Sequence, residues 1–186
     1  MADFEDLLKT RRSIRDFEEK NVSTEIVKEL IKDSCLAPNA GNRQPWQFII
    51  VNDQAVIKKI SNDSKKNLVA DIEQNPASPM KAYEGALRNP TFNIFYNAPC
   101  LVYFGGIRGT RSLQIDCTLA ASYFMFTASN RGLGTCWIGL GNYIQSAELL
   151  KSVGAPEDFE IVAPIIIGYP KSIPEIPPRN EPTIFE

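Results

Sequence analysis

Histidine is absent from the 186-residue sequence. This absence excludes Ser-His-Asp and Cys-His catalytic triads, most zinc sites and acid–base catalysis by histidine. Cysteine is scarce, and its four copies, at positions 35, 100, 117 and 136, form no CxxC pair. A zinc ribbon or a thioredoxin-like redox centre therefore has no local support. We expect buried free thiols and no metal site.

Long apolar runs and an excess of charge are also missing. No segment approaches the roughly 18 uninterrupted apolar residues that span a membrane, and the N-terminal residues lack the apolar core of a secretory signal. Twenty Lys and Arg residues against 22 Asp and Glu residues give a net charge of −2, which argues against a dedicated nucleic-acid binder. The sequence predicts a cytoplasmic protein with neither a membrane nor a nucleic-acid partner.

What is present is the composition of a globular domain, with 44% hydrophobic and 23% charged residues. We expect one domain over residues 1–186, with residues 170–186 as an extended C-terminal arm, because five of those 17 residues are proline. An extended arm of this kind could reach a partner subunit. A disordered tail is the alternative.

Apolar periodicity and turn residues predict an α+β fold. A run of β-branched residues that contains Pro164 should be an edge strand or a bulged one. Residues 76–99, with four prolines, should form a surface excursion or lid. We expect helices over residues 3–10, 23–37, 53–75, 111–130 and 145–152, and strands over residues 47–51, 100–104, 135–138 and 161–167.

The helix expected over residues 111–130 is apolar almost all round. Between Cys117 and Ala128 only Thr118, Ser122 and Thr127 are clearly polar. A helix without a polar face must be buried on every side. It therefore lies either at the centre of the domain or at a subunit interface.

Three guanidinium groups and a hydroxyl follow the first helix. Arg11, Arg12, Ser13 and Arg15 fall within five residues. Arginine binds phosphate oxygens through two parallel hydrogen bonds, so this segment favours a nucleotide or cofactor phosphate. The alternative is a solvated basic face that pairs with the acidic residues at positions 16, 18 and 19.

Two further segments have side chains or backbone suited to a flat heterocycle. The loop over residues 37–46 offers the amides of Asn39, Asn42 and Gln44, which both donate and accept hydrogen bonds, although ordinary turn chemistry also explains them. The segment GLGTCWIG, over residues 132–139, fails the dinucleotide fingerprint because Trp137 occupies the place of its third glycine. Its glycines let the backbone approach a flat ligand, and a plain helix-to-strand turn is the alternative.

Taken in order, RRSIR, APNAGNRQPW, GLGTCWIG and the proline-flanked Arg179 resemble the motifs of the nitroreductase family of FMN-dependent oxidoreductases. The resemblance spans nearly the whole chain. It implies a homodimer of α+β subunits, each with a central, mostly antiparallel sheet flanked by helices. It also implies a C-terminal extension that crosses to the partner, and two FMN molecules at the subunit interface.

The resemblance also implies a role for each motif. Arg15 would lie near N1 and O2 of the flavin, where a fixed positive charge stabilises the reduced ring. The backbone N–H near Gly139 would point at N5. The remaining expected FMN contacts are Arg11, Arg12, Ser13 and Arg179 at the phosphate and ribitol, Trp137, Ile138 and Gly139 against the ring, and Pro38, Asn39, Ala40, Asn42 and Gln44 from the other subunit.

The activity that follows is transfer of two electrons from NAD(P)H through FMN to a small acceptor in a ping-pong cycle. A nitro compound, a quinone or a conjugated carbonyl would serve as acceptor. Because flavin N5 carries the hydride, no catalytic side chain or metal is required. The alternatives are a flavin carrier or sensor without NAD(P)H turnover, and a dimeric interaction module that binds no flavin.

Overall fold

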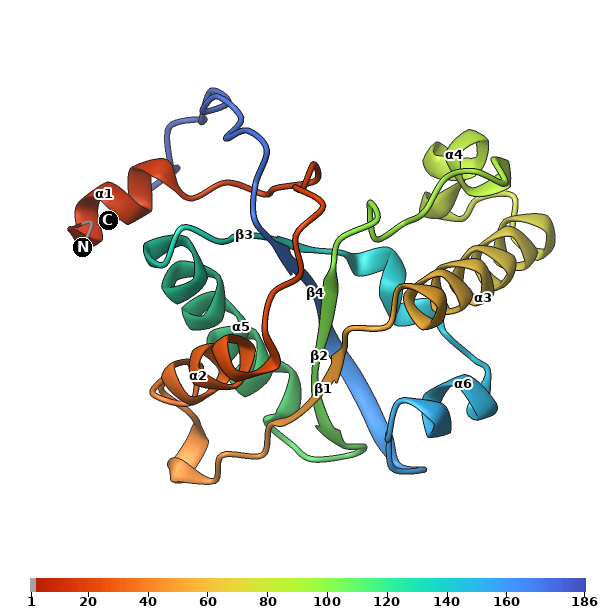
Figure 1. Cartoon of the computed structure of the whole chain (residues 1–186), viewed down its shortest axis with the longest axis horizontal. Coiled ribbons are helices and arrows are strands. Elements are labelled where there is room, and N and C mark those ends of the chain that lie inside the picture. The colour runs from red at the N-terminus through yellow and green to blue at the C-terminus, as the bar shows by residue number, and fades with distance from the viewer. Residues whose placement is uncertain (1–2) are drawn as a thin grey trace.

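A four-stranded antiparallel sheet forms the centre of the computed structural model, which describes residues 3–186 (Figure 1). The strands lie in the order β1-β2-β4-β3, and every neighbouring pair is antiparallel. Their bounds are Gln47–Val51 (β1), Cys100–Ile107 (β2), Gly134–Trp137 (β3) and Phe159–Gly168 (β4). All four expected strands are present, and the expected α+β fold with an antiparallel sheet is confirmed.

Six α-helices and three 3-10 helices accompany the strands in residues 3–186. The second helix begins where expected, because the Ser23 hydroxyl accepts the Ile26 N–H at 3.3 Å. It ends at Ser34, a turn earlier than the Ala37-Pro38 boundary that we predicted. The helices are α1 (Phe4–Thr10), α2 (Thr24–Ser34), α3 (Gln54–Gln74), α4 (Glu84–Arg88), α5 (Leu113–Asn130) and α6 (Ala147–Ser152), with η1 (Ala40–Asn42), η2 (Pro79–Tyr83) and η3 (Gly139–Tyr143).

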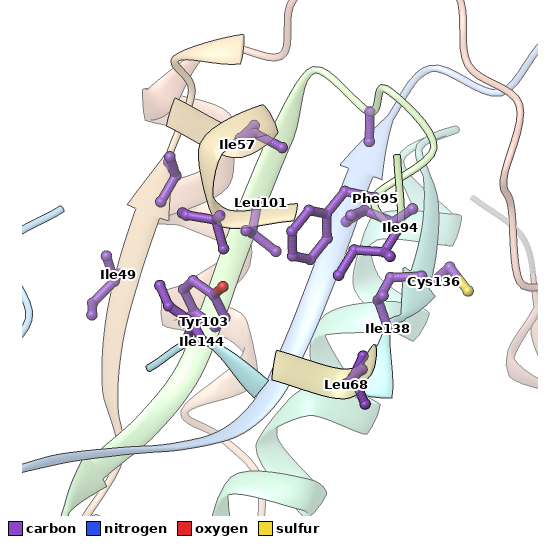
Figure 2. Close-up of a cluster of buried hydrophobic side chains, with 14 of the residues drawn as sticks. Ile49, Ile57, Leu68, Ile94, Phe95, Leu101, Tyr103, Cys136, Ile138 and Ile144 are labelled. Atoms are coloured by element: carbon purple, nitrogen blue, oxygen red, sulfur yellow. The ribbon is translucent and has the colours of Figure 1, made fainter. Parts of the chain in front are cut away.

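Both faces of the sheet are buried. Leu101 and Tyr103 of β2 point toward α3, where they join a cluster that contains Ile57 and Leu68 (Figure 2). Alternate residues of the same strand, such as Phe104, belong to a second cluster on the opposite face, together with residues of α2 and α5. Because helices cover both faces, the central strand is a continuous apolar run and not an alternating one.

Pro164 does not mark an edge strand, so that alternative was wrong. Strand β4 lies between β2 and β3, and a bulge places Val162 as an extra residue opposite the step from Phe104 to Gly105. The Pro164 carbonyl accepts the N–H of Ile138, the residue after β3, at 2.8 Å. The N and O of one residue face the same side of an antiparallel strand, so the proline nitrogen faces the point where β3 ends. A central strand can therefore contain this proline.

Residues 76–99 are not a simple surface excursion. Ile94 and Phe95 are fully buried and belong to the α3-side cluster. The buried Lys65 of α3 donates through Nζ to the carbonyls of Asn89 and Phe92, each at 2.7 Å. This segment is therefore fastened to α3 along part of its length, and Leu87 of its helix α4 is also buried in the α3-side cluster.

Helix α5 is buried on one side only within a single chain. Phe124 is fully buried on that side, whereas Ile115 is 67% exposed and Tyr123 is 42% exposed on the other. The expectation that α5 is surrounded at the centre of the domain is therefore wrong for the face that contains Ile115 and Tyr123. Phe4 and Leu8 of α1 are also exposed, and Phe4 lies 6.0 Å from the ring of Phe126. An apolar surface therefore extends from α5 onto α1.

The proline-rich tail leaves the sheet beside the start of the chain. The Lys171 N–H donates to the Asp16 carbonyl at 3.1 Å, and residues 171–186 contain no helix or strand. Figure 1 shows this tail running back toward α1. No helix within residues 3–186 is both long and apolar enough to cross a membrane.

Candidate functional site

Residues 11–17 run past the edge strand β3 and then past Pro170, which follows β4. The Ile14 N–H donates to the Thr135 carbonyl at 2.9 Å, and Ser13 and Thr135 form a parallel bridge. This close approach requires Gly134, because a Cβ there would lie 2.6 Å from Cγ1 of Ile14. The chain thereby places the RRSIR segment along the side of the sheet, next to the end of α1.

The arginines of this segment are crowded with one another and with the tail. Burial lowers the pKa of Arg11, and the charges of Arg12 and Arg179 lower it further. The Arg12 guanidinium donates to the carbonyls of Lys9 and Arg11, and its buried Nε has no partner among residues 3–186. The structure thus brings together the three arginines that were predicted to share one phosphate.

No carboxylate neutralises this cluster in the described part of the chain. None of Arg11, Arg12, Arg15 and Arg179 forms an ion pair within residues 3–186, and Asp16 pairs instead with Lys171 at 3.3 Å. A solvated face paired with nearby acids is therefore not what the structure contains. Guanidinium groups without a carboxylate partner, of which Arg11 and Arg12 are half-buried and Arg15 and Arg179 exposed, fit a polyanionic ligand.

A cleft of about 400 Å³ opens beyond Arg15, where β3 ends. Trp137, Ile138 and Gly139, the residues expected to face the ring, form one side of this cleft; their contact with a ring stays a prediction. A Cβ at Gly139 would meet nothing within 4 Å, so the backbone there is open to a ligand. The Gly139 N–H begins η3 and has no acceptor among the hydrogen bonds of residues 3–186, so it is free to donate into the cleft.

Sequence reasoning missed the opposite side of this cleft. Tyr96 stacks beneath Arg15, whose guanidinium carbon lies 5.8 Å from the ring centroid. Tyr96 has a φ of 52°, which tyrosine rarely adopts and which no turn motif in the sequence indicates. The full set that sequence reasoning missed is Met80, Tyr83, Ile94, Tyr96, Leu140 and Tyr143.

Cys136 lies beneath the arginine segment as a buried thiol. Burial raises its pKa, and the nearby Arg15, Ser13 and Arg11 offset only part of that rise. The thiol is therefore protonated at neutral pH and is a poor nucleophile. All four cysteines are free, and all but the half-buried Cys35 are buried, as expected.

The amide-rich loop lies at the other end of α5. The Ala40 N–H donates to Oδ1 of Asp116, in the first turn of that helix, at 3.0 Å. Arg11 and Arg12 instead line a small hollow with Ser129, in the last turn. At 1.5 Å per residue, these two turns are roughly 20 Å apart. A single chain therefore does not bring Pro38, Asn39, Ala40, Asn42 and Gln44 to the arginine cluster.

The model of the nitroreductase family matches residues 8–169. A protein of Archaeoglobus fulgidus with the proposed name NADH dehydrogenase/NAD(P)H nitroreductase is 26% identical over 166 residues, which cover 89% of this chain and 84% of that protein. An iodotyrosine deiodinase of Thermotoga neapolitana is 24% identical over 179 residues, covering 95% and 93%.

Solved structures agree on the fold. A nitroreductase with bound FMN from Bacteroides fragilis superposes with a TM-score of 0.84 at 19% identity, and the match covers 100% of this chain and 99% of that one. The family model covers both the arginine segment and the end of β3, the two parts of the candidate site that a single chain brings together. This chain belongs to the nitroreductase family.

Proposed function

We propose that this chain is an FMN-dependent oxidoreductase that takes two electrons from NAD(P)H and passes them to a small acceptor. The observation that carries the proposal is the unpaired cluster of Arg11, Arg12 and Arg179 beside an aromatic cleft that contains a further arginine, Arg15. FMN has the matching parts, a phosphate dianion and a flat ring. When bound, FMN accepts a hydride and passes the electrons on.

Each element of the cluster has a distinct task in this proposal. Arg11, Arg12 and Arg179 hold the phosphate through charge-assisted hydrogen bonds, and the Ser13 hydroxyl adds one more. Arg15 supplies a fixed positive charge at the ring edge where negative charge develops. Trp137 and the other apolar residues of the cleft provide a surface on which the flat ring can pack beside this charge.

We further propose that the functional unit is a homodimer with a shared site. The loop over residues 38–44 lies at the opposite end of α5 from the arginine cluster of its own chain, roughly 20 Å along the helix, and we infer that its amides serve a second subunit's ring. The exposed apolar face of α5, with Ile115 and Tyr123, supports the same arrangement, because such a face is typical of an interface.

The visible absorption spectrum of purified, dialysed protein, recorded before and after anaerobic addition of NADH or NADPH, tests the proposal. A yellow protein that bleaches supports an FMN oxidoreductase. A yellow protein that bleaches with neither nucleotide is a flavin carrier or sensor. A protein that stays colourless after incubation with FMN contradicts the whole site assignment.

Arg15→Ala tests the proposed charge at the ring. The side chain is exposed, so the fold should be retained, while the reduction of bound FMN by NAD(P)H should slow. Losing one electrostatic group of this kind commonly costs about 10²–10³ in rate. A stopped-flow rate equal to that of the wild type, with flavin still bound, would remove Arg15 from this role.

A further inference from the structure

Asp116 is a buried carboxylate outside the cleft. It is 1% exposed, and its Oδ1 accepts the Ala40 N–H at 3.0 Å, whereas its buried Oδ2 has no partner among residues 3–186. Burying a carboxylate is unfavourable unless hydrogen bonds compensate, and here the compensation within the chain is partial. An apolar residue would fill this place at lower cost if packing were its only requirement.

The loop that Asp116 contacts has a strained backbone. Gly41 adopts its φ of 61° without strain, but Asn42 and Gln44 have φ values of 54° and 48°. Positive φ is unfavourable for asparagine and more so for glutamine, so the surroundings must enforce it. Such strain is commonly concentrated in segments that contact ligands.

Packing does not enforce this conformation, because residues 40–44 are exposed. The side-chain hydrogen bonds of the loop are mostly internal, as in the Gln44 N–H to Asn39 Oδ1 bond at 3.0 Å and the Gln44 Nε2 to Asn42 Oδ1 bond at 3.1 Å. Among the described residues, the Asp116 bond to Ala40 is the one hydrogen bond that ties residues 39–44 to a distant part of the chain.

The position of Asp116 in its helix suits this task. It lies in the first turn of α5, where the helix dipole favours a negative charge. Helix α5 is anchored on the sheet by its buried face, so a carboxylate fixed to it is a rigid reference point for the exposed loop.

We propose that Asp116 is a positioning residue for the flavin-facing loop. Acting through the Ala40 N–H, it holds Asn39, Asn42 and Gln44 in the conformation that receives the ring bound by the partner subunit. This inference rests on the proposed function, because the ligand of the loop is taken to be FMN.

Asp116→Leu and Asp116→Asn separate this role from a structural one. Leucine fills the buried space but cannot accept the Ala40 N–H, so FMN binding should weaken about tenfold or more, as when a hydrogen bond to a charged group is lost. Thermal stability should be unchanged or higher, because exchanging a buried charge for an apolar group is often favourable. Asparagine retains an acceptor, so it should restore most of the FMN affinity and provides the test if the leucine variant does not fold.

Asp53→Leu is a matched control, because Asp53 also accepts backbone N–H groups, those of Ala55 and Val56 at 2.8 and 3.2 Å, but caps α3. It should lower the melting temperature and leave FMN affinity unchanged. If Asp116→Leu lowers stability and FMN affinity together, or lowers neither, the positioning role is wrong.

Hydrogen exchange of the apoprotein tests the same contact without flavin. The Ala40 amide should exchange slowly in the wild type and in Asp116→Asn, and quickly in Asp116→Leu. Equal exchange in the wild type and Asp116→Leu overturns the proposal. Slow exchange in a wild type that binds no FMN would instead contradict the proposed function while leaving the anchoring of the loop by Asp116 in place.

Discussion

Replacing Gly134 with alanine tests whether close packing of residues 11–17 on β3 builds the proposed phosphate site. The new Cβ would lie 2.6 Å from Cγ1 and 2.8 Å from Cβ of Ile14, whereas carbon atoms prefer about 3.5–4.0 Å. Because the Ile14 Cβ is fixed to its backbone, a change of rotamer cannot relieve the contact. The arginine segment must therefore move away from the strand.

The magnitude follows from two opposing effects on the free energy of unfolding. Overpacking a buried contact costs about 1–3 kcal/mol. Alanine also lowers the conformational entropy of the unfolded chain, which offsets about 0.4–1 kcal/mol of this loss in the free energy of unfolding. The offset applies because Gly134 does not have a positive φ, which alanine would disfavour. Gly134→Ala should therefore be about 1–2 kcal/mol less stable, with a melting temperature about 2–8 °C lower. Loss of one charge-assisted hydrogen bond to the phosphate would weaken FMN binding about tenfold to hundredfold.

Urea unfolding of the apoprotein and titration with FMN measure the two effects separately. Gly85→Ala is the matched control, because a Cβ at this position in α4 meets nothing within 4 Å. It should leave FMN affinity unchanged and stability equal or slightly higher. If Gly134→Ala has the unfolding midpoint and the FMN affinity of the wild type, the arginine segment does not depend on this contact.

Ile115→Glu puts a carboxylate on the exposed face of α5 and should yield a monomer without FMN; light scattering that still finds a dimer contradicts the proposed interface. Tyr96→Leu removes the ring beneath Arg15 and should slow FMN reduction by NAD(P)H about two- to fivefold, whereas Tyr96→Phe keeps the ring and should not. Equal stopped-flow rates in the two variants would show that the contact between Tyr96 and Arg15 does not affect the reduction. Burial raises the pKa of Cys100 and Cys117 to about 12. Above about pH 9 these thiols lose their protons in the unfolded chain but keep them in the folded protein, so the free energy of unfolding should fall from pH 9 to 11 in urea titrations. The fall should be less steep in Cys100→Ala, and an equal slope in the variant and the wild type would refute the raised pKa.

The four strands and five of the six α-helices within residues 3–186 could be predicted because their signals are local, whereas α4, in residues 76–99, was not predicted. Apolar and β-branched runs mark all four strands, and Ser23 marks the start of α2. Sheet order is not local, however, so the sequence did not reveal that β4 is central or that Pro164 sits opposite the end of β3.

The candidate site likewise has parts that could be predicted from the sequence and parts that could not. Residues 11–15 and the end of β3 are each one continuous stretch of sequence, and their chemical character is visible in the residue types. Tyr83 and Tyr96 reach the cleft through a segment whose course depends on its attachment to Lys65 and on an uncommon φ, and neither has a sequence signature. Asp116 was not singled out, because a lone acid at the start of an apolar helix resembles an ordinary first-turn residue.

The length of α5 between the loop and the arginine cluster has a consequence for mixtures of chains. If each site combines one chain's arginines with the other chain's loop, two inactive variants can complement each other. A hybrid of one Arg12→Ala subunit and one Asn39→Ala subunit would concentrate both defects in one site and leave the other intact. Mixing the two inactive homodimers under exchange conditions would then restore activity up to about a quarter of that of the wild type, because random pairing makes half of the dimers hybrid and each hybrid has one working site.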